Sequence, residues 1–345
     1  MSASKKRLLI CVQAVDLDDP LMGFFVSWLQ QAAPSFDHLT VFALRVGRYT
    51  LPENITVVPL RTSGSHSKAA VVFRVLKEAW SRRAAYDAVF VRGDPHYVLC
   101  AGWLWRLLGK KIVFWYAHYR TSRWARWAAS MANVVVSSAQ AGEAGLPKLR
   151  IIGQGFESTR FPQMTRSLPA DWKVLIFGRM DRSKSVKELL EVFRKVPSSF
   201  PFRLTLIGCS GDPGYEQILD PLVQADPRVS WEKRTVVYAV VPELFAKHDV
   251  ILNATDGSLD KTILEAGLSG LIPLASTDAM KEWLPQDARW LHCSSEETFV
   301  HGLERVAGLS ESKYAQLLRS IREAVQMHHG AQAQIAKLVA VFEEV

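Results

Sequence analysis

Two polar segments in the second half of the chain carry the cations and the carboxylate that a charged ligand needs. Gly178 and Arg179 follow an apolar run, and Lys184 lies just beyond them on the same turn. Farther along, a turn of small residues enters a helical pattern that carries Glu265. Paired cations neutralise a diphosphate, a helix N-terminus binds its oxygens, and a carboxylate accepts hydrogen bonds from vicinal hydroxyls. These residue types predict a site for a sugar activated by a nucleoside diphosphate.

The turn before Glu265 supplies the remaining candidates for this donor site. Ser258 is predicted to cap the helix and to leave backbone N–H groups for phosphate oxygens. The polar residues around it are Asp256, Asp260 and Lys261. The simpler interpretations are that Arg179 and Lys184 are solvated surface charges and that Glu265 is an ordinary helical carboxylate.

Two loops in the first half supply candidates for a second substrate. The loop after the first apolar run contains Asp16 and Asp18, which can bind an acceptor hydroxyl, and Gly23, whose backbone can approach a donor phosphate. His118 and Arg120 follow another buried apolar run, where the histidine can orient a hydroxyl group and the arginine can bind the acceptor. The alternatives are solvated loop acids, a turn glycine and a structural histidine. The chain has no GxGxxG sequence, which argues against a dinucleotide site.

These candidates lie at the ends of short apolar runs that alternate with helical patterns. Near-continuous apolar runs are typical of parallel strands buried on both faces, and ligands bind beyond the carboxyl ends of such strands. The predicted strands are residues 8–12, 39–44, 55–60, 88–91, 111–116, 133–136 and 150–152, then 173–177, 203–207, 229–231, 249–253, 272–275 and 289–292. The predicted helices include residues 24–33, 69–83, 99–108 and 314–345, the last with a kink at residues 328–330.

The alternation of strands and helices occurs twice along the chain. It predicts an α/β protein of two Rossmann-like, doubly wound domains. We expect the first domain over residues 1–155, with a helix at about residues 328–345 packing back on it. The second domain is expected over residues 156–327.

Composition limits the classes of protein that fit. The chain has 345 residues and a formal net charge of +8, and its positive excess and most of its tryptophans fall in residues 1–160. The four cysteines are far apart and fit no zinc or disulfide pattern, so we expect no metal site and a reducing, cytoplasmic location. No run approaches the ~20 apolar residues of a membrane span. No nucleic-acid-binding motif is present, so nucleic acid is not an expected partner.

Residues 103–111 and 120–127 combine tryptophans with cations, as interfacial segments do. This pattern predicts peripheral contact with an anionic membrane, at its inner face, or with an anionic acceptor. The alternative is that these tryptophans pack in the core and the cations are solvated.

Four motifs, in this order, resemble glycosyltransferase family 4. They are Gly155 to Phe161, Phe177-Gly178-Arg179 with Lys184, Leu206-Ile207-Gly208, and Ser258 to Pro273. The resemblance implies the GT-B fold, in which two Rossmann-like domains face a central cleft. It also implies that the first domain binds the acceptor, that the second binds the donor, and that neither a metal nor another cofactor is required.

One position departs from the family pattern. The family carries an EX7E motif, and Glu265 matches its second glutamate, which holds the donor ribose. The first glutamate, which contacts the transferred hexose, is replaced here by Gly257. That contact then comes from Asp256, from Asp260, from backbone groups or from nothing. A family variant that carries GSxDK fits this stretch, with Ser258 and Lys261 assisting at the donor.

The resemblance implies retaining transfer of a hexose-type sugar from a nucleotide-diphosphate sugar to a glycan or lipid-linked acceptor, in the synthesis of cell-surface polysaccharide or glycolipid. Arg179 and Lys184 would stabilise the leaving diphosphate, and His118 would orient the reacting groups. The alternatives are a non-catalytic GT-B subunit, which would fit the missing glutamate, and a sugar-nucleotide 2-epimerase, which shares the fold.

Overall fold

The computed structural model describes residues 6–19, 22–61, 67–118, 121–141, 145–161, 166–255 and 259–344. Four residues considered above, namely Arg120, Asp256, Gly257 and Ser258, lie outside these ranges. The chain divides into two compact units. Unit 1 comprises Met1–Glu157 and His329–Val345, and unit 2 comprises Ser158–His328.

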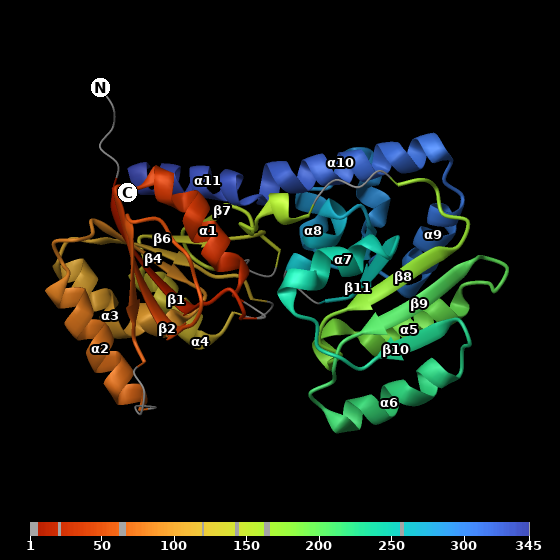
Figure 1. Cartoon of the computed structure of the whole chain (residues 1–345), viewed down its shortest axis with the longest axis horizontal. Helices are drawn as coiled ribbons and strands as arrows, with labels where there is room; N and C mark the ends of the chain where they lie inside the picture. Colours follow the sequence, from red (N-terminus) through yellow and green to blue (C-terminus); the bar gives the residue numbers. More distant parts are fainter. Residues whose placement is uncertain are drawn as a thin grey trace. The chain divides into compact units, whose positions relative to one another are not determined.

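Unit 1 is built on a parallel sheet whose strand order is β3-β2-β1-β4-β5-β6-β7. The strands are β1 (Arg7–Val15), β2 (His38–Val46), β3 (Ile55–Pro59), β4 (Ala88–Arg92), β5 (Lys111–Trp115), β6 (Val134–Ser137) and β7 (Leu149–Ile151). The helices are α1 (Phe24–Ala32), α2 (Lys68–Ser81), α3 (Pro95–Leu107), α4 (Arg123–Met131) and α11 (Ala331–Glu344). Helices α2, α3 and α4 cover one face of the sheet, and α1 and α11 cover the other (Figure 1).

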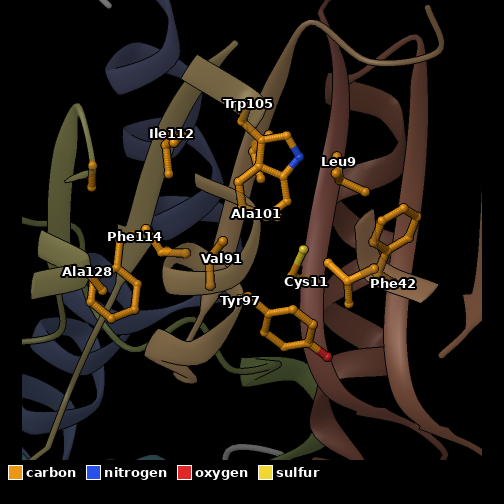
Figure 2. Packing of buried hydrophobic residues seen from close by; sticks show 14 of the residues in the cluster. Leu9, Cys11, Phe42, Val91, Tyr97, Ala101, Trp105, Ile112, Phe114 and Ala128 are labelled. Carbon is orange, nitrogen blue, oxygen red and sulfur yellow. The ribbon is translucent and has the colours of Figure 1, made fainter. Parts of the chain in front are cut away.

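Both faces of this sheet are apolar because alternate strand residues point to opposite sides. On β4, Val89 and Val91 face the core shared with α2, α3 and α4, where Cys11, Tyr97 and Trp105 are also packed (Figure 2). On the same strand, Phe90 faces α1, where its ring lies 6.0 Å from that of Trp28. Arg92, the last residue of β4, therefore points to the α1 side, as Phe90 does.

Unit 2 has a parallel sheet in the order β10-β9-β8-β11-β12. Its strands are β8 (Trp172–Phe177), β9 (Phe202–Ile207), β10 (Val229–Glu232), β11 (Val250–Asn253) and β12 (Ile272–Ala275). Its helices are α5 (Val186–Lys195), α6 (Pro213–Gln224), α7 (Val241–Ala246), α8 (Lys261–Leu268), α9 (Glu296–Ala307) and most of α10 (Glu311–His329). The two parallel sheets confirm the predicted α/β class.

One predicted strand is wrong. Residues 286–291 form a 3-10 helix, and His292 makes only a single bridge, to Ala275. Pro285 precedes this segment in an extended conformation and starts the turn, because proline has no N–H to donate to a sheet. The expected kink near the C-terminus is confirmed, since α10 ends at His329 and α11 begins at Ala331.

Candidate functional site

The loops after β8 and β9 of unit 2 lie against each other at the carboxyl edge of the sheet. The backbone N–H of Gly178 donates to the carbonyl of Ile207, and that of Met180 donates to the carbonyl of Cys209. Gly208 has φ +154°, and a Cβ there would lie 1.7 Å from the carbonyl oxygen of Gly178. Glycine at this position therefore permits the close contact that places Arg179 at the sheet edge.

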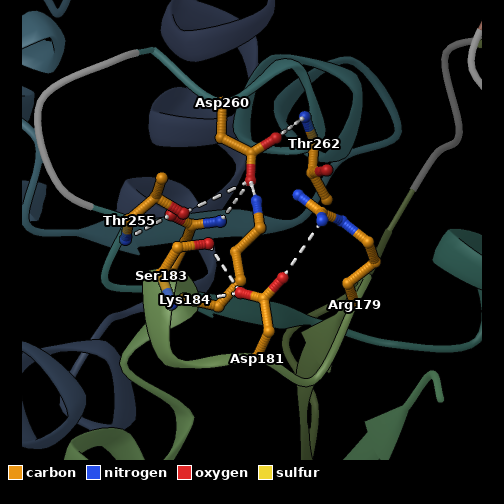
Figure 3. A network of polar contacts seen from close by, with 8 residues as sticks. Arg179, Asp181, Ser183, Lys184, Thr255, Asp260 and Thr262 are labelled. Carbon is orange, nitrogen blue, oxygen red and sulfur yellow. Dashed lines mark hydrogen bonds and ion pairs between the residues drawn. The ribbon is translucent and has the colours of Figure 1, made fainter. Parts of the chain in front are cut away.

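Lys184 ends a short 3-10 helix, Arg182–Lys184, whose start is capped by the side chain of Asp181. The ammonium group of Lys184 forms an ion pair with the Oδ2 atom of Asp260 (Figure 3). Asn253 donates to the same oxygen at 2.9 Å. The side chains of Lys184 and Asp260 are only 18% and 11% exposed, so the ion pair is largely shielded from water.

Asp260 is ionised in this setting. Burial alone would raise the pKa of Asp260, but the nearby charge of Lys184 and the hydrogen bonds from Lys184, Thr262 and Asn253 hold it well below its usual range. Of the two predicted cations, Arg179 is thus exposed, whereas Lys184 is fixed by a buried carboxylate and does not fit the simpler interpretation of a solvated charge.

The N-cap of α8 differs from the predicted one. Asp260, rather than Ser258, is the N-cap residue, and its Oδ1 atom accepts a hydrogen bond of 3.0 Å from the backbone N–H of Thr262. The N–H of Ile263 donates to the carbonyl of Asp260. A carboxylate is a better partner than a hydroxyl for the positive end of a helix dipole, and it also binds Lys184. Two N–H groups at the start of α8 are consequently already used within the chain.

Glu265 is buried on α8, with 2% exposure. The hydroxyl of Tyr238 donates to its Oε1 atom at 2.8 Å, and the Lys261 ammonium lies 3.7 Å from that atom. Lys261 and Arg160 both lie against the Tyr238 ring, at 4.7 and 5.0 Å from its centroid. Burial raises the pKa of Glu265, and the positive charge of Lys261 and the hydrogen bond from Tyr238 offset only part of that rise. Glu265 is thus an oriented carboxylate rather than a solvated helical one.

Arg179 is the exposed cation of the site, with 76% of its side chain accessible. Its guanidinium lies 3.2 Å from the carboxylate of Asp181, which also accepts from the hydroxyl of Ser183. An exposed ion pair of this kind contributes little to stability, ~0–1 kcal/mol. Arg179 can therefore exchange Asp181 for a ligand oxygen at small cost.

The acidic loop after β1 in unit 1 is tied to the loop after β2. Asp16 accepts hydrogen bonds of 3.1 Å from the backbone N–H groups of Asp18 and Arg48. Asp18 binds Arg48 through two hydrogen bonds, which lower the pKa of the Asp18 carboxyl. Gly23 donates its N–H to Asp19, and a Cβ at Gly23 would lie 2.8 Å from two backbone oxygens. These three candidates thus have contacts within the loops of unit 1, and their roles at a substrate stay predictions.

His118 is exposed, three residues after the end of β5, and its ring stacks near that of Tyr116 at 6.1 Å. It lies at the carboxyl edge of the sheet of unit 1, as predicted from the sequence.

A cavity of about 310 Å³ is also found in unit 1. It is lined by Leu44, Arg61, Lys68, Val71, Val72, Val75, Asp94, His96, Tyr97 and Cys100.

Sequence reasoning missed Asn253, Tyr238 and Arg92. Asn253 ends β11 and Arg92 ends β4, so the rule that polar residues at strand ends deserve attention should have found both. Tyr238 lies in a short 3-10 helix with no pattern that links it to Glu265.

Within the described residues, no group of three or more His, Cys, Asp or Glu side chains could hold a metal ion. Nor is any helix there long and apolar enough to cross a membrane.

Comparisons with known proteins identify the fold. No protein-family model and no curated protein sequence matches the chain. Solved structures do match. Anabaena HepE in complex with UDP-glucose has a TM-score of 0.72 at 15% identity, over 99% of this chain and 100% of the other. The lipopolysaccharide outer core galactosyltransferase WaaB has a TM-score of 0.69 at 14% identity, over 98% and 99%.

An enzyme of another activity has a similar structure. A structure described as a UDP-N-acetylglucosamine 2-epimerase from Listeria monocytogenes has a TM-score of 0.63 at 14% identity, over 99% of this chain and 98% of the other. At such low identities the similarity concerns the fold alone. The chain has the GT-B fold, matched over nearly its full length by glycosyltransferase structures.

Proposed function

We propose that the chain is a retaining glycosyltransferase that moves a hexose from a nucleotide-diphosphate sugar to a glycan or lipid-linked acceptor. The observation that carries the proposal is the site on unit 2, where α8 holds both the buried, oriented Glu265 and Asp260, the partner of Lys184. Arg179 is exposed on the same turn as Lys184. HepE, which has the same fold, has been solved with UDP-glucose, so this donor class is the first to test. Unit 2 then binds the donor, and unit 1 binds the acceptor.

Each residue has a distinct task in this reaction. Arg179 and Lys184 stabilise negative charge that develops on the leaving diphosphate. Glu265 accepts hydrogen bonds from the ribose hydroxyls, which a buried carboxylate with a fixed orientation does well. The departing phosphate oxygen takes the proton of the attacking acceptor hydroxyl on the same face of the sugar, so the anomeric configuration is retained. His118 orients the acceptor on unit 1.

A non-catalytic role is the second candidate, because Gly257 stands where the family carries its first glutamate. Epimerisation is the third, because the matching Listeria structure is described as an epimerase. Product analysis separates the three. Transfer gives a glycosylated acceptor and a free nucleoside diphosphate, epimerisation changes the donor without an acceptor, and a binding subunit gives neither product.

The decisive experiment starts from donor binding. UDP-, GDP-, ADP- and dTDP-sugars are compared for the rise in unfolding temperature that each produces, since a ligand that binds the native state stabilises it by mass action. The donor so found is then incubated with candidate acceptors, and the anomeric configuration of the product is determined by NMR. Lys187→Ala is the matched control for a variant of Lys184. Lys187 is an exposed cation that follows Lys184 in the chain and pairs with Glu191. No stabilisation by any donor would refute the proposal.

The proposed function includes contact with an anionic membrane through α3 and α4 of unit 1. Trp103 and Leu107 on α3 and Trp124 and Trp127 on α4 are exposed, whereas Trp105 is fully buried. The Arg123 guanidinium lies 4.8 Å from the Trp124 ring, and the described residues of α4 include no acid. Exposed indoles beside arginines are typical of surfaces that bind anionic lipids.

Vesicle sedimentation tests this contact. The bound fraction should rise with the content of anionic lipid, and Trp124→Ala/Trp127→Ala should lower it. Trp290→Ala is the control, because Trp290 in unit 2 also stacks with an arginine, Arg305, at 4.4 Å. Binding that is independent of anionic lipid, or equal in the two variants, would contradict the membrane contact.

A further inference from the structure

Arg92 of unit 1 is a buried cation that the proposed reaction has not used. It ends β4 and is only 5% exposed. Its guanidinium lies 4.1 Å from the Trp115 ring centroid and 5.4 Å from the centroids of both Phe24 and Phe25. Trp115 is its register partner on β5, and the two phenylalanines begin α1. Three aromatic rings from two elements thus enclose one positive charge.

The hydrogen-bonding capacity of Arg92 is mostly unused. Its Nη2 group donates to the carbonyl of Gln154 at 3.2 Å, but its Nη1 group is buried and has no hydrogen-bond partner. Within the described ranges, no carboxylate forms an ion pair with Arg92. Asp94, two residues after Arg92 in the chain, binds the ring of His96.

Two arginines of unit 2 show how the same chain buries this side chain for structural purposes. Arg228 binds the carboxylate of Asp226 and donates to two backbone carbonyls. Arg166 pairs with Asp249, and both of its terminal nitrogens donate to backbone carbonyls. Each of these arginines has a counter-ion, whereas Arg92 has none among the residues that the structure describes.

A buried charge without a counter-ion is unfavourable for the folded chain. Cation–π contacts offset part of the desolvation, but they satisfy no N–H donor. Burial accordingly lowers the pKa of Arg92 to about 9. A ligand that supplied an oxyanion would remove this deficit, because arginine binds carboxylate and phosphate through paired hydrogen bonds.

The surroundings of Arg92 offer further polar atoms in need of partners. The Nε1 group of Trp115 and the Oε1 atom of Gln154 are also buried without hydrogen-bond partners. The segment that contains Gln154 is held in place, because the side chain of Gln334 in α11 donates a hydrogen bond of 2.6 Å to the carbonyl of Gly153. Next to Arg92, Gly93 has φ +87°, and a Cβ there would meet no atom within 4 Å. The backbone next to Arg92 is therefore not packed against other atoms on this side.

We propose that Arg92 binds the anionic group, a carboxylate or a phosphate, of the acceptor substrate. The oxyanion binds the Nη1 group and the Trp115 indole N–H, while a hydroxyl of the same sugar donates to the side-chain oxygen of Gln154. This assigns an acidic or phosphorylated acceptor to unit 1, whose strands β4 and β5 are neighbours and place Arg92 close in topology to the loop of His118. The inference rests on the proposed function.

Calorimetric titration of the full chain tests it. Glucuronate, glucose 6-phosphate and neutral glucose are the probes, with saturating UDP present in a parallel series. The wild type should bind at least one of the two anions saturably and should not bind glucose. Preference for glucuronate indicates an acidic sugar as the acceptor, and preference for glucose 6-phosphate indicates a phosphorylated one. If neither anion binds at millimolar concentration, the inference is refuted.

Two variants at position 92 locate the binding. Arg92→Met removes the charge, and Arg92→Lys keeps it without the planar fork, so anion affinity should fall by roughly 100-fold and roughly 10-fold respectively. Arg92→Met should unfold at the same temperature as the wild type or higher, whereas the control Arg228→Met should unfold at a lower one. Wild-type anion affinity in a folded Arg92→Lys or Arg92→Met protein would overturn the inference.

The UDP series separates this inference from the proposed function. If UDP binds and neither anion binds, the Arg92 site is refuted and the proposed donor site is unaffected. Anions that bind through Arg92 while no nucleotide sugar binds would refute the glycosyltransferase proposal and leave an anion site on unit 1.

Discussion

Replacing Lys184 should damage both stability and activity, for different reasons that a second substitution can separate. Lys184→Met leaves the carboxylate of Asp260 buried with hydrogen bonds from Asn253 and Thr262 but no cation. Removing one partner of a buried ion pair costs about 3–5 kcal/mol. In a unit of this size, each kcal/mol of lost stability lowers the unfolding temperature by ~2–4 °C. The expected fall in unfolding temperature is therefore about 6–20 °C.

The double variant Lys184→Met/Asp260→Asn removes both charges. Asparagine still caps α8, since its side-chain oxygen can accept from the N–H of Thr262. Stability should therefore return to within about 1–2 kcal/mol of the wild type, because an ion pair replaced as a whole costs little. Sugar transfer should remain low by roughly 10²-fold or more, since the cation that stabilises the leaving diphosphate is still missing.

Thermal unfolding and single-turnover transfer are measured on the wild type, both single variants and the double variant. Recovery of transfer together with stability would refute the catalytic assignment, because Lys184 would then be only the counter-ion of Asp260. The pH dependence gives an independent check. The pKa of Asp260 is lowered in the folded chain, so its contribution is present at neutral pH and is lost only as the pH falls through the folded value.

Three further predictions concern the same site. Glu265→Gln should raise the unfolding temperature at pH 7. The pKa of Glu265 is raised in the folded chain, so the stability that its protonated form contributes is lost as the pH rises through the folded pKa. Glutamine is neutral like the protonated form and does not lose this stability. Donor affinity should fall about 10- to 100-fold with the loss of a charged acceptor, and titration calorimetry that shows no change would contradict the ribose contact. Gly208→Ala should destabilise the chain by at least ~1–3 kcal/mol in chemical denaturation, since its Cβ would lie 1.7 Å from a backbone oxygen, while Gly211→Ala, in open space, serves as control. Treatment with EDTA should leave the transfer rate unchanged, and a loss restored by a divalent metal would exclude the cation-based mechanism.

The strands were predictable wherever burial on both faces produced an uninterrupted apolar run, as in β1 and β8. The prediction was wrong for residues 289–292, because Pro285 directs that segment into a 3-10 helix. Arg92 is absent from the predicted site residues, although it directly follows the predicted strand at residues 88–91 and precedes Gly93. The structure adds it to that strand as the last residue of β4.

Pairing across the sheet was not predictable, because it depends on which strands become neighbours. Lys184 and Asp260 are far apart in sequence and meet only because β8 and β11 are adjacent, so that the loop after β8 faces the start of α8. Sequence spacing describes residues on one helix or one strand and contains no information on such a contact. The identity of the helix cap depends on the same contact, since Asp260 binds Lys184 and caps α8 at once.

Among the described residues of the proposed donor site, the charges are therefore paired within the chain. Lys184 is neutralised by Asp260, and the carboxylate of Glu265 lies beside Lys261. The Arg179–Asp181 pair, in contrast to these two, is open to water, where it contributes ~0–1 kcal/mol and can be exchanged. A diphosphate that approaches this edge can draw Arg179 away from Asp181 at little cost, but it cannot move Lys184 without leaving a buried carboxylate unpaired. In the proposed reaction, Arg179 is thus the cation suited to capture the donor, and Lys184 is the one whose position is already set when the bond to the sugar breaks.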